Sequence, residues 1–140
     1  MDSIGKGKLI TVDIELLEGR PIHERITYIK GSSTDEKVVQ QISDMIKENQ
    51  VVLVILDSDH NMPHVLREME IYSEFVSVGS YMIVEDSNIN GHPIMKNWGD
   101  GPFEAIQEFL NKSDSFEIDK DREKYYMTFN PNGYLRKIKE

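Results

Sequence analysis

Three short apolar runs of strand length each end in acidic residues, and this repeated arrangement constrains the fold most strongly. The runs and their acids are Leu9–Val12 with Asp13, Val51–Leu56 with Asp57, and Tyr81–Val84 with Glu85 and Asp86. Stretches compatible with helices alternate with strand-like runs, which predicts an α/β domain with a mostly parallel sheet. In such a sheet the carboxyl ends of parallel strands lie at one edge, where ligands bind.

Apolar residues at helical spacing predict three helices. They recur over residues 34–49, with Thr34 or Ser33 as the N-cap, and again over residues 63–75. A third helix is predicted to start near Asp100, because the proline that follows is tolerated in a first turn.

The remaining strands define the expected sheet. Ile26–Lys30 is predicted to be a strand, and Val51–Leu56 is apolar at every position, which is typical of a strand buried on both faces. No helix fits between Phe116–Ile118 and Lys124–Phe129, so these two are expected to form an antiparallel hairpin at the sheet edge. The 140 residues, 39% of them hydrophobic, suit a single packed domain.

Charge and cysteine content exclude several classes of function. The formal net charge is -9, whereas nucleic-acid binders concentrate Lys and Arg, so no nucleic-acid partner is expected. The chain has no cysteine, which removes disulfides, thiolate metal sites and cysteine nucleophiles. No apolar run reaches the length of a membrane span or of a signal-peptide core, so a cytoplasmic location is the expectation.

The strand-end acids predict a cation site. Asp57, Glu85 and Asp86 follow two strands that are expected to be neighbours, and three crowded carboxylates repel one another unless a cation neutralises them. Oxygen ligands without cysteine favour Mg²⁺, Mn²⁺ or Ca²⁺. The alternative is that these acids are helix caps and solvated strand ends.

Two residues of the first half are candidates for a nucleotide-type ligand. A carboxylate at the position of Asp13 can accept hydrogen bonds from both hydroxyls of a ribose, although Glu15 competes for that role and a simple cap is the alternative. Ser33 follows Gly31 and could lie near an adenine edge, or it could cap the following helix.

Histidines and the single tryptophan lie near the predicted opening. His60 and His64 are four residues apart and could share a transition-metal site, but a general base, a substrate contact or a surface position explains His60 more simply. His92 lies in a Gly-His-Pro loop, where a surface histidine is the plainer interpretation. Trp98 is expected either to floor a pocket or to fix its loop to the core.

Six segments together are more specific than any single motif. They are Val54-Ile-Leu-Asp-Ser-Asp-His, His64-Val-Leu-Arg-Glu-Met-Glu-Ile-Tyr, Val76-Ser-Val-Gly-Ser-Tyr-Met-Ile-Val-Glu-Asp, Asn90-Gly-His-Pro, Gly101-Pro-Phe-Glu-Ala and Phe129-Asn-Pro-Asn-Gly-Tyr-Leu. The set resembles the cephalosporin hydroxylase and rhamnosyl O-methyltransferase family over most of the chain. The resemblance implies a Rossmann-like class I methyltransferase fold that uses S-adenosylmethionine and Mg²⁺.

The resemblance also implies roles for individual residues. It makes Asp57, Glu85 and Asp86 the Mg²⁺ ligands, with Asp59 as the substitute for the first of them. The implied reaction is O-methylation of a hydroxyl on a small-molecule acceptor, either a sugar or a secondary metabolite, and therefore a form of lipid or carbohydrate modification. Mg²⁺ would lower the pKa of that hydroxyl and hold its oxygen in line with the methyl group.

On the cofactor side, the resemblance implies that S-adenosylmethionine contacts Asp13 through its ribose, Ser33 near its adenine, and Asp59. His60 would be the catalytic residue on the substrate side. Hydroxylation is not supported, because neither a flavin fingerprint nor a convincing two-histidine, one-carboxylate triad is visible.

One departure from the family pattern concerns the first strand and its glycine-rich turn, which would cradle the methionine part of the cofactor. Nothing upstream of Leu9 matches them. The expectation is therefore an N-terminally truncated domain whose sheet lacks its first strand, which a partner or a second copy in a homo-oligomer could complete. A non-catalytic remnant of such an enzyme is the first alternative.

A second alternative is a receiver-like phosphoacceptor domain. Asp59 would then be the phosphoacceptor, Asp13 and Glu15 the Mg²⁺ acids, and Ser87 the hydroxyl switch. Residues 15–25 contain Gly and Pro and are too short for the crossover helix that a receiver needs. The predicted C-terminal hairpin also fits no receiver.

Overall fold

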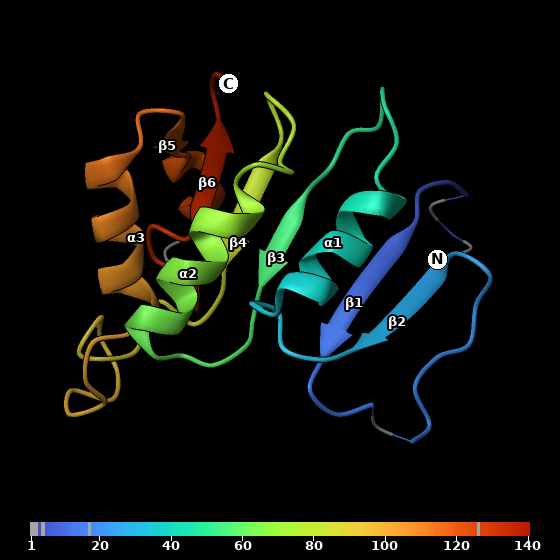
Figure 1. Ribbon diagram of the computed structural model, residues 1–140. Helices are drawn as coiled ribbons and strands as arrows, with labels where there is room; N and C mark the ends of the chain where they lie inside the picture. The colour runs from blue at the N-terminus through green and yellow to red at the C-terminus, as the bar shows by residue number, and fades with distance from the viewer. Residues whose placement is uncertain (1–2, 4, 17, 126) are drawn as a thin grey trace. The chain divides into compact units, whose positions relative to one another are not determined.

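The computed structural model shows an α/β protein whose chain divides into two compact units, Met1–Lys47 and Glu48–Glu140 (Figure 1). The structure describes residues 3, 5–16, 18–125 and 127–140. Each unit has its own sheet. In the described part of the chain, no helix is long and apolar enough to cross a membrane.

The first unit contains two parallel strands and one helix. β1 (Leu9–Asp13) pairs with β2 (Ile26–Lys30), and the register places Asp13 beside Lys30. The described residues between these strands form no helix, as expected from their length. α1 (Glu36–Met45) follows β2.

The start of α1 differs from the prediction. Neither Thr34 nor Ser33 is the N-cap; the side chain of Asp35 accepts hydrogen bonds from the backbone N–H groups of Lys37 and Val38. A carboxylate at this position also interacts favourably with the helix dipole, which a hydroxyl cannot do as well. The helix ends four residues before the predicted limit, because the backbone turns extended at Ile46.

The second unit is a four-stranded mixed sheet with two helices. Its strands, in spatial order, are β3 (Val54–Leu56), β4 (Tyr81–Val84), β6 (Tyr134–Lys137) and β5 (Phe116–Ile118). β3 and β4 are parallel, and β6 is antiparallel to both of its neighbours. Its helices are α2 (Met62–Tyr72) and α3 (Pro102–Lys112).

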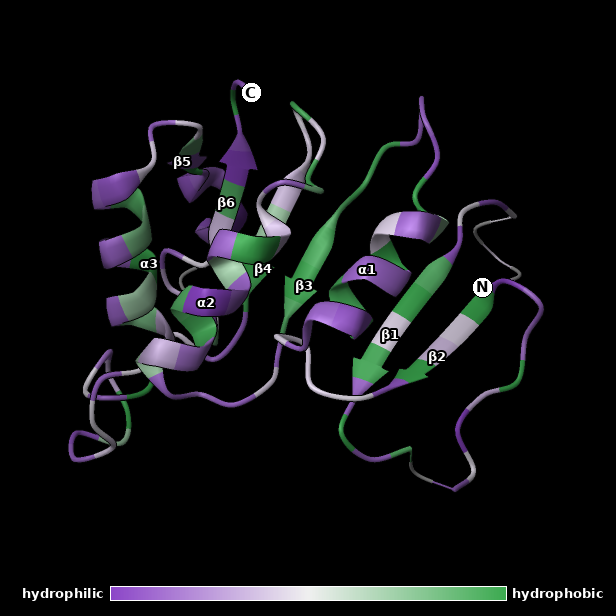
Figure 2. Cartoon of the chain, in the orientation of Figure 1, coloured by the Kyte–Doolittle hydropathy of each residue, from purple (hydrophilic) through white to green (hydrophobic). Residues whose placement is uncertain are grey.

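The two helices of this unit pack side by side over the core. Figure 2 shows α3 hydrophilic on the side away from α2 and hydrophobic on the side toward it. The core is fully buried at Met69 of α2, Met82 of β4, Ile106 of α3 and Leu135 of β6. Burial of these side chains drives the packing, since each removes apolar surface from water.

The prediction of a six-residue strand buried on both faces was wrong. Only Val54–Leu56 forms β3, at the edge of its sheet, and exposure alternates along the run. Val51 is 84% and Ile55 55% exposed, whereas Leu56 is 7% exposed. Within this unit β3 has a hydrogen-bonding neighbour on one side only, and continuous apolarity does not reveal that.

The predicted hairpin partner was also wrong. In the described residues Lys124–Phe129 forms no strand, and Tyr126 lies outside them; β5 pairs instead with β6. The turn before this segment closes locally, because the Asp119 carboxylate accepts from the N–H of Asp121. Gly133 then lets β6 approach β4, since a Cβ there would lie 2.2 Å from the Val84 carbonyl oxygen.

Candidate metal centre and its surroundings

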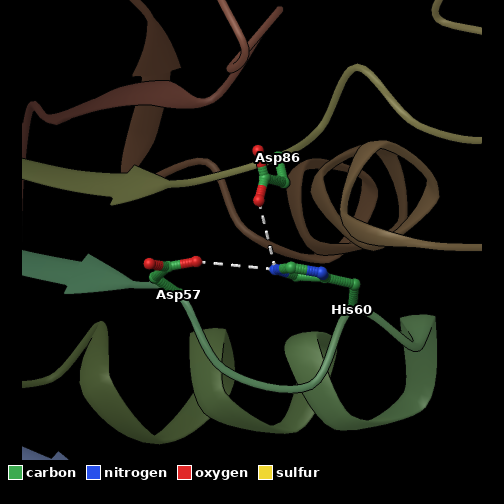
Figure 3. Close-up of side chains that lie close together, drawn as sticks. All are labelled: Asp57, His60 and Asp86. Carbon is green, nitrogen blue, oxygen red and sulfur yellow. Dashed lines mark ion pairs between the residues drawn. The ribbon is translucent and has the colours of Figure 1, made fainter. Parts of the chain in front are cut away.

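Two acids and a histidine converge at the carboxyl ends of β3 and β4. Asp57 directly follows β3, Asp86 lies two residues after β4, and His60 lies in the loop before α2. Because the two strands are parallel neighbours, their ends meet at the same edge. Figure 3 shows the His60 imidazole between the two carboxylates, with Nε2 3.5 Å from Asp57 Oδ1 and 3.5 Å from Asp86 Oδ2.

The imidazole nitrogen at the centre of this group has no hydrogen-bond partner among the described residues. His60 Nε2 is buried, and its 3.5 Å separations from both carboxylates are longer than a normal hydrogen bond. One potential ligand atom from each of Asp57, His60 and Asp86 lies within 4.8 Å of the others. Buried polar atoms are normally satisfied, so the group has the donor set and the spacing that an added cation or hydroxyl would complete.

Glu85 contributes to the electrostatics of the same edge. Burial raises the pKa of the Glu85 carboxyl above its ordinary value, and the charges of Asp57 and Asp86 raise it further. Its backbone N–H donates to the Leu56 carbonyl at 2.9 Å, which ties the ends of β3 and β4 together. Carboxylates that lie close together repel one another, and a divalent cation stabilises such an arrangement.

Backbone geometry fixes the direction of Asp86. This residue adopts φ of +52°, in the left-handed region that non-glycine residues visit rarely. Its N–H donates to the side chain of Asn130 at 2.9 Å, and Asn130 is 8% exposed. The neighbouring Ser87 is fully buried and donates to the Pro131 carbonyl. The turn at 130–133 therefore holds Asp86 in place, a role that a turn motif alone does not reveal.

A buried carboxylate of α2 binds the loop between β3 and α2. Glu68 is 1% exposed and accepts a 2.6 Å hydrogen bond from the Ser58 hydroxyl, which directly follows Asp57. Its other oxygen lies 3.5 Å from His64 Nε2. Burial, and next the Glu68 charge, raise the pKa of Tyr72 to about 12. Sequence reasoning missed Glu68, although it shares a helical face with the apolar Val65, Met69 and Tyr72.

The hypothesis of a two-histidine metal site is not supported by this arrangement. His64 faces Glu68, whereas the group of potential ligands in the described chain contains His60 with Asp57 and Asp86. Asp59 lies outside that group. Its carboxylate accepts from the backbone and side-chain N–H groups of Asn61 and so stabilises the start of α2.

Two of the residues predicted to contact the cofactor, Asp13 and Ser33, belong to the first unit. Asp13 Oδ1 accepts from the Glu15 N–H at 2.8 Å, and the Asp13 carbonyl accepts from the Gly31 N–H at 2.9 Å. The second bond brings the segment that leads to Ser33 to the carboxyl end of β1. Asp13 and Ser33 are therefore at one edge of the two-stranded sheet.

Comparison with known proteins gives a consistent family. A family model described as "Rhamnosyl O-methyltransferase/CmcI" matches residues 1–138. The rhamnosyl O-methyltransferase of Mycobacterium tuberculosis (strain ATCC 25618 / H37Rv) is 40% identical over 134 residues, which are 91% of this chain and 55% of that protein. The Mycobacterium leprae (strain TN) protein is 38% identical over 133 residues, 91% of this chain and 58% of that one. The chain thus spans little more than half the length of these curated relatives.

Solved structures show the same fold at low identity. The MycE methyltransferase from the mycinamycin biosynthetic pathway, in complex with Mg and SAH, matches with a TM-score of 0.58 and 14% identity, over 95% of this chain and 38% of that one. A complex of MycE with Mg, SAH and mycinamycin VI gives a TM-score of 0.53 and 18% identity, over 75% and 28% of the two chains.

Proposed function

The chain belongs to the rhamnosyl O-methyltransferase/CmcI family, and on that premise we propose that it carries the metal site of a Mg²⁺- and S-adenosylmethionine-dependent O-methyltransferase. The observation that carries the proposal is the convergence of the Asp57 and Asp86 carboxylates at the ends of β3 and β4, beside a buried His60 nitrogen with no hydrogen-bond partner among the described residues. The acceptor is a hydroxyl of a sugar or of a sugar-bearing secondary metabolite. Two findings support these assignments: the mycobacterial relatives are rhamnosyl O-methyltransferases, and MycE is known in complex with Mg, SAH and mycinamycin VI.

The proposed ligands of the cation are Asp57, Glu85 and Asp86. Burial, and next the charges of Asp57 and Asp86, raise the pKa of the Glu85 carboxyl, and hard oxygen donors fit Mg²⁺. When bound, Mg²⁺ lowers the pKa of the acceptor hydroxyl and S-adenosylmethionine supplies the methyl group. The protein's own task is then to orient the hydroxyl and to receive its proton.

His60 is the proposed proton acceptor. Its Nε2 points to the space between the two carboxylates, where an acceptor hydroxyl would meet it (Figure 3). Asp13, Ser33 and Asp59 remain the proposed contacts of S-adenosylmethionine.

Calorimetric titration of the 140-residue chain with S-adenosylhomocysteine, with and without Mg²⁺, tests the proposal. Micromolar binding that strengthens with Mg²⁺ would support it. An Asp86→Asn chain should lose the Mg²⁺ effect, whereas Asp114→Asn, at an exposed carboxylate paired with Lys139, should retain it. No binding of either ligand by a chain that unfolds cooperatively would favour the alternative of a non-catalytic remnant.

A further inference from the structure

The loop between β4 and α3 packs against the residue that the proposed function places at the acceptor. The indole N–H of Trp98 donates to the His60 carbonyl at 3.3 Å, and the Asp100 carbonyl accepts from the Met62 N–H at 3.0 Å. A Cβ on Gly101 would lie 3.2 Å from the same His60 carbonyl oxygen. This loop, residues 90–101, is therefore a neighbour of the candidate metal centre.

The carboxylate of Glu104, in the first turn of α3, binds both the start and the end of this loop. Glu104 Oε1 accepts from the Asn90 side-chain amide at 3.0 Å and lies 2.9 Å from His92 Nε2, while Oε2 accepts from the Gly101 N–H at 2.8 Å. Asn90 in turn accepts from the Gly99 N–H, next to Trp98. Polar groups thus hold the loop on both sides of the tryptophan.

The apolar side chains of this fixed loop are nevertheless exposed. Trp98 is 49%, Met95 57% and Ile94 41% exposed, and Figure 2 shows hydrophobic colour along part of this loop below α2 and α3. A tryptophan that served only to anchor the loop would gain most by burying its whole ring. Here the indole is held by its N–H, and about half of the side chain stays accessible beside His60.

We propose that the indole of Trp98 is a wall of the acceptor site and stacks against the C–H face of the acceptor's sugar ring. The proposal rests on the proposed function, which places a sugar hydroxyl at His60. A pyranose presents C–H groups on its faces and hydroxyls around its rim, so an aromatic wall beside a proton acceptor can bind the face while the rim meets the histidine. The exposed side chains of Met95 and Ile94 would extend this apolar wall, where they could contact a methyl group of the sugar or the aglycone of the acceptor.

The chain's single tryptophan makes the test direct, because its emission reports on Trp98 alone. Methyl α-L-rhamnopyranoside is titrated into the 140-residue chain in the presence of Mg²⁺, with the open-chain polyol sorbitol as the matched solute. A saturable change in emission with the rhamnoside and not with sorbitol supports the proposal. Unchanged emission, or the same change with both solutes, overturns it.

Two variants separate stacking from a purely structural role. Saturation-transfer NMR follows binding of the rhamnoside to Trp98→Phe, which keeps a ring, and to Trp98→Leu, which does not. Loss of an aromatic contact corresponds to about a three- to tenfold weaker affinity, so the leucine variant should fall by that factor and the phenylalanine variant by less. Equal binding by all three chains would contradict stacking.

Mg²⁺ binding by the same chains distinguishes failure of the proposed acceptor wall from failure of the proposed metal site. If the wild-type chain binds Mg²⁺ but the rhamnoside does not contact Trp98, the acceptor wall is wrong and the metal site stands. If the chain does not bind Mg²⁺, the proposed function itself fails. The leucine variant should bind Mg²⁺ as the wild-type chain does, because the indole N–H of Trp98 donates to the backbone carbonyl of His60, which is not a proposed ligand.

Discussion

Both sheets of this protein have acids at the carboxyl ends of parallel strands, but the residues beside these acids differ between the two sheets. In the first unit, Asp13 lies in register with Lys30, and its carboxylate caps the N–H of Glu15. In the second unit, Asp57 and Glu85 follow the paired residues Leu56 and Val84, so acid stands beside acid. The chain itself supplies a hydrogen bond to the acid of the first unit, whereas the strand-end acids of the second unit form no ion pair with Lys or Arg among the described residues and attract a cation from outside. An acid follows an apolar strand in both units, so this pattern alone does not distinguish them. The residue at the end of the neighbouring strand decides the role of the acid.

The strongest way to break this comparison is to neutralise one acid in each unit. Asp86→Asn should weaken Mg²⁺ affinity by at least about 100-fold, because it removes a proposed ligand rather than an outer contact. Without metal, the variant should be as stable as the wild-type chain or more so, since like-charge repulsion is relieved. Asp13→Asn should leave Mg²⁺ affinity unchanged. Calorimetric Mg²⁺ titration and a thermal melt of each variant measure both effects, and unfolding of Asp86→Asn would mean that the acid is structural.

The next largest effect is expected for Glu68, the buried carboxylate that binds the β3–α2 loop of the candidate metal centre. Glu68→Ala leaves the Ser58 hydroxyl without its buried acceptor and removes the carboxylate that faces His64, and should lower the free energy of unfolding by about 2 kcal/mol. Glu68→Gln keeps an oxygen for Ser58 and should cost less. Urea unfolding at pH 7 compares the three chains, and equal midpoints would show that the loop does not depend on Glu68.

The first unit offers a matched acid whose role is purely local. Asp35→Ala removes the N-cap of α1 and should destabilise the protein by about 1 kcal/mol, with no change in Mg²⁺ affinity. Asp35→Ser should recover most of the loss, because a hydroxyl can cap the same N–H groups. Helix content followed by circular dichroism during urea unfolding checks this, and a loss of Mg²⁺ binding would contradict the separation of roles.

The smallest expected effect concerns pH. Burial acts to raise the pKa of Glu104, but hydrogen bonds from the Gly101 N–H, His92 and Asn90 outweigh it and leave the pKa below the ordinary 4.5. A carboxyl with a depressed pKa in the folded state stabilises the fold fully above its unfolded pKa, and this contribution is lost as the pH falls through the folded value. The wild-type chain should therefore exceed Glu104→Gln in stability by less than about 1 kcal/mol at pH 7. That difference should shrink below about pH 4.5, toward the folded pKa, and urea unfolding at several pH values would show a constant difference if this account were wrong.

Local signals predicted much of this structure from sequence. The β-branched and apolar residues of Leu9–Asp13 and Tyr81–Val84 are typical of strands, so these two strands were predicted. The start of α3 was predicted because Pro102 is tolerated in a first helical turn. The edge position of β3 and the pairing of β5 with β6 depend instead on contacts between distant segments. Apolar periodicity carries no information about which strand lies next to which.

The convergence of two strand-end acids was predictable from sequence, whereas the residues that hold them in place were not. Asp57 and Asp86 follow strands, so their convergence follows from topology. The contacts of Asn130 and Glu68 join residues 44 and 10 positions apart, and no spacing rule indicates them. A cap was one of the alternatives for Asp13 from sequence, whereas the contact of Asp59 with Asn61 was not predicted, because a carboxylate near a turn can bind its own backbone or a ligand equally well.

A Mn²⁺ titration of the 140-residue chain followed by electron paramagnetic resonance tests the central claim most directly. Mn²⁺ takes the same oxygen ligands as Mg²⁺, and its free form is counted from the signal that remains. The account predicts one tight ion per chain, displaced by Mg²⁺, and lost in Asp57→Asn and Asp86→Asn but retained in Asp114→Asn. A folded wild-type chain that leaves all Mn²⁺ free, or that binds it equally with and without Asp57 and Asp86, would contradict the claim.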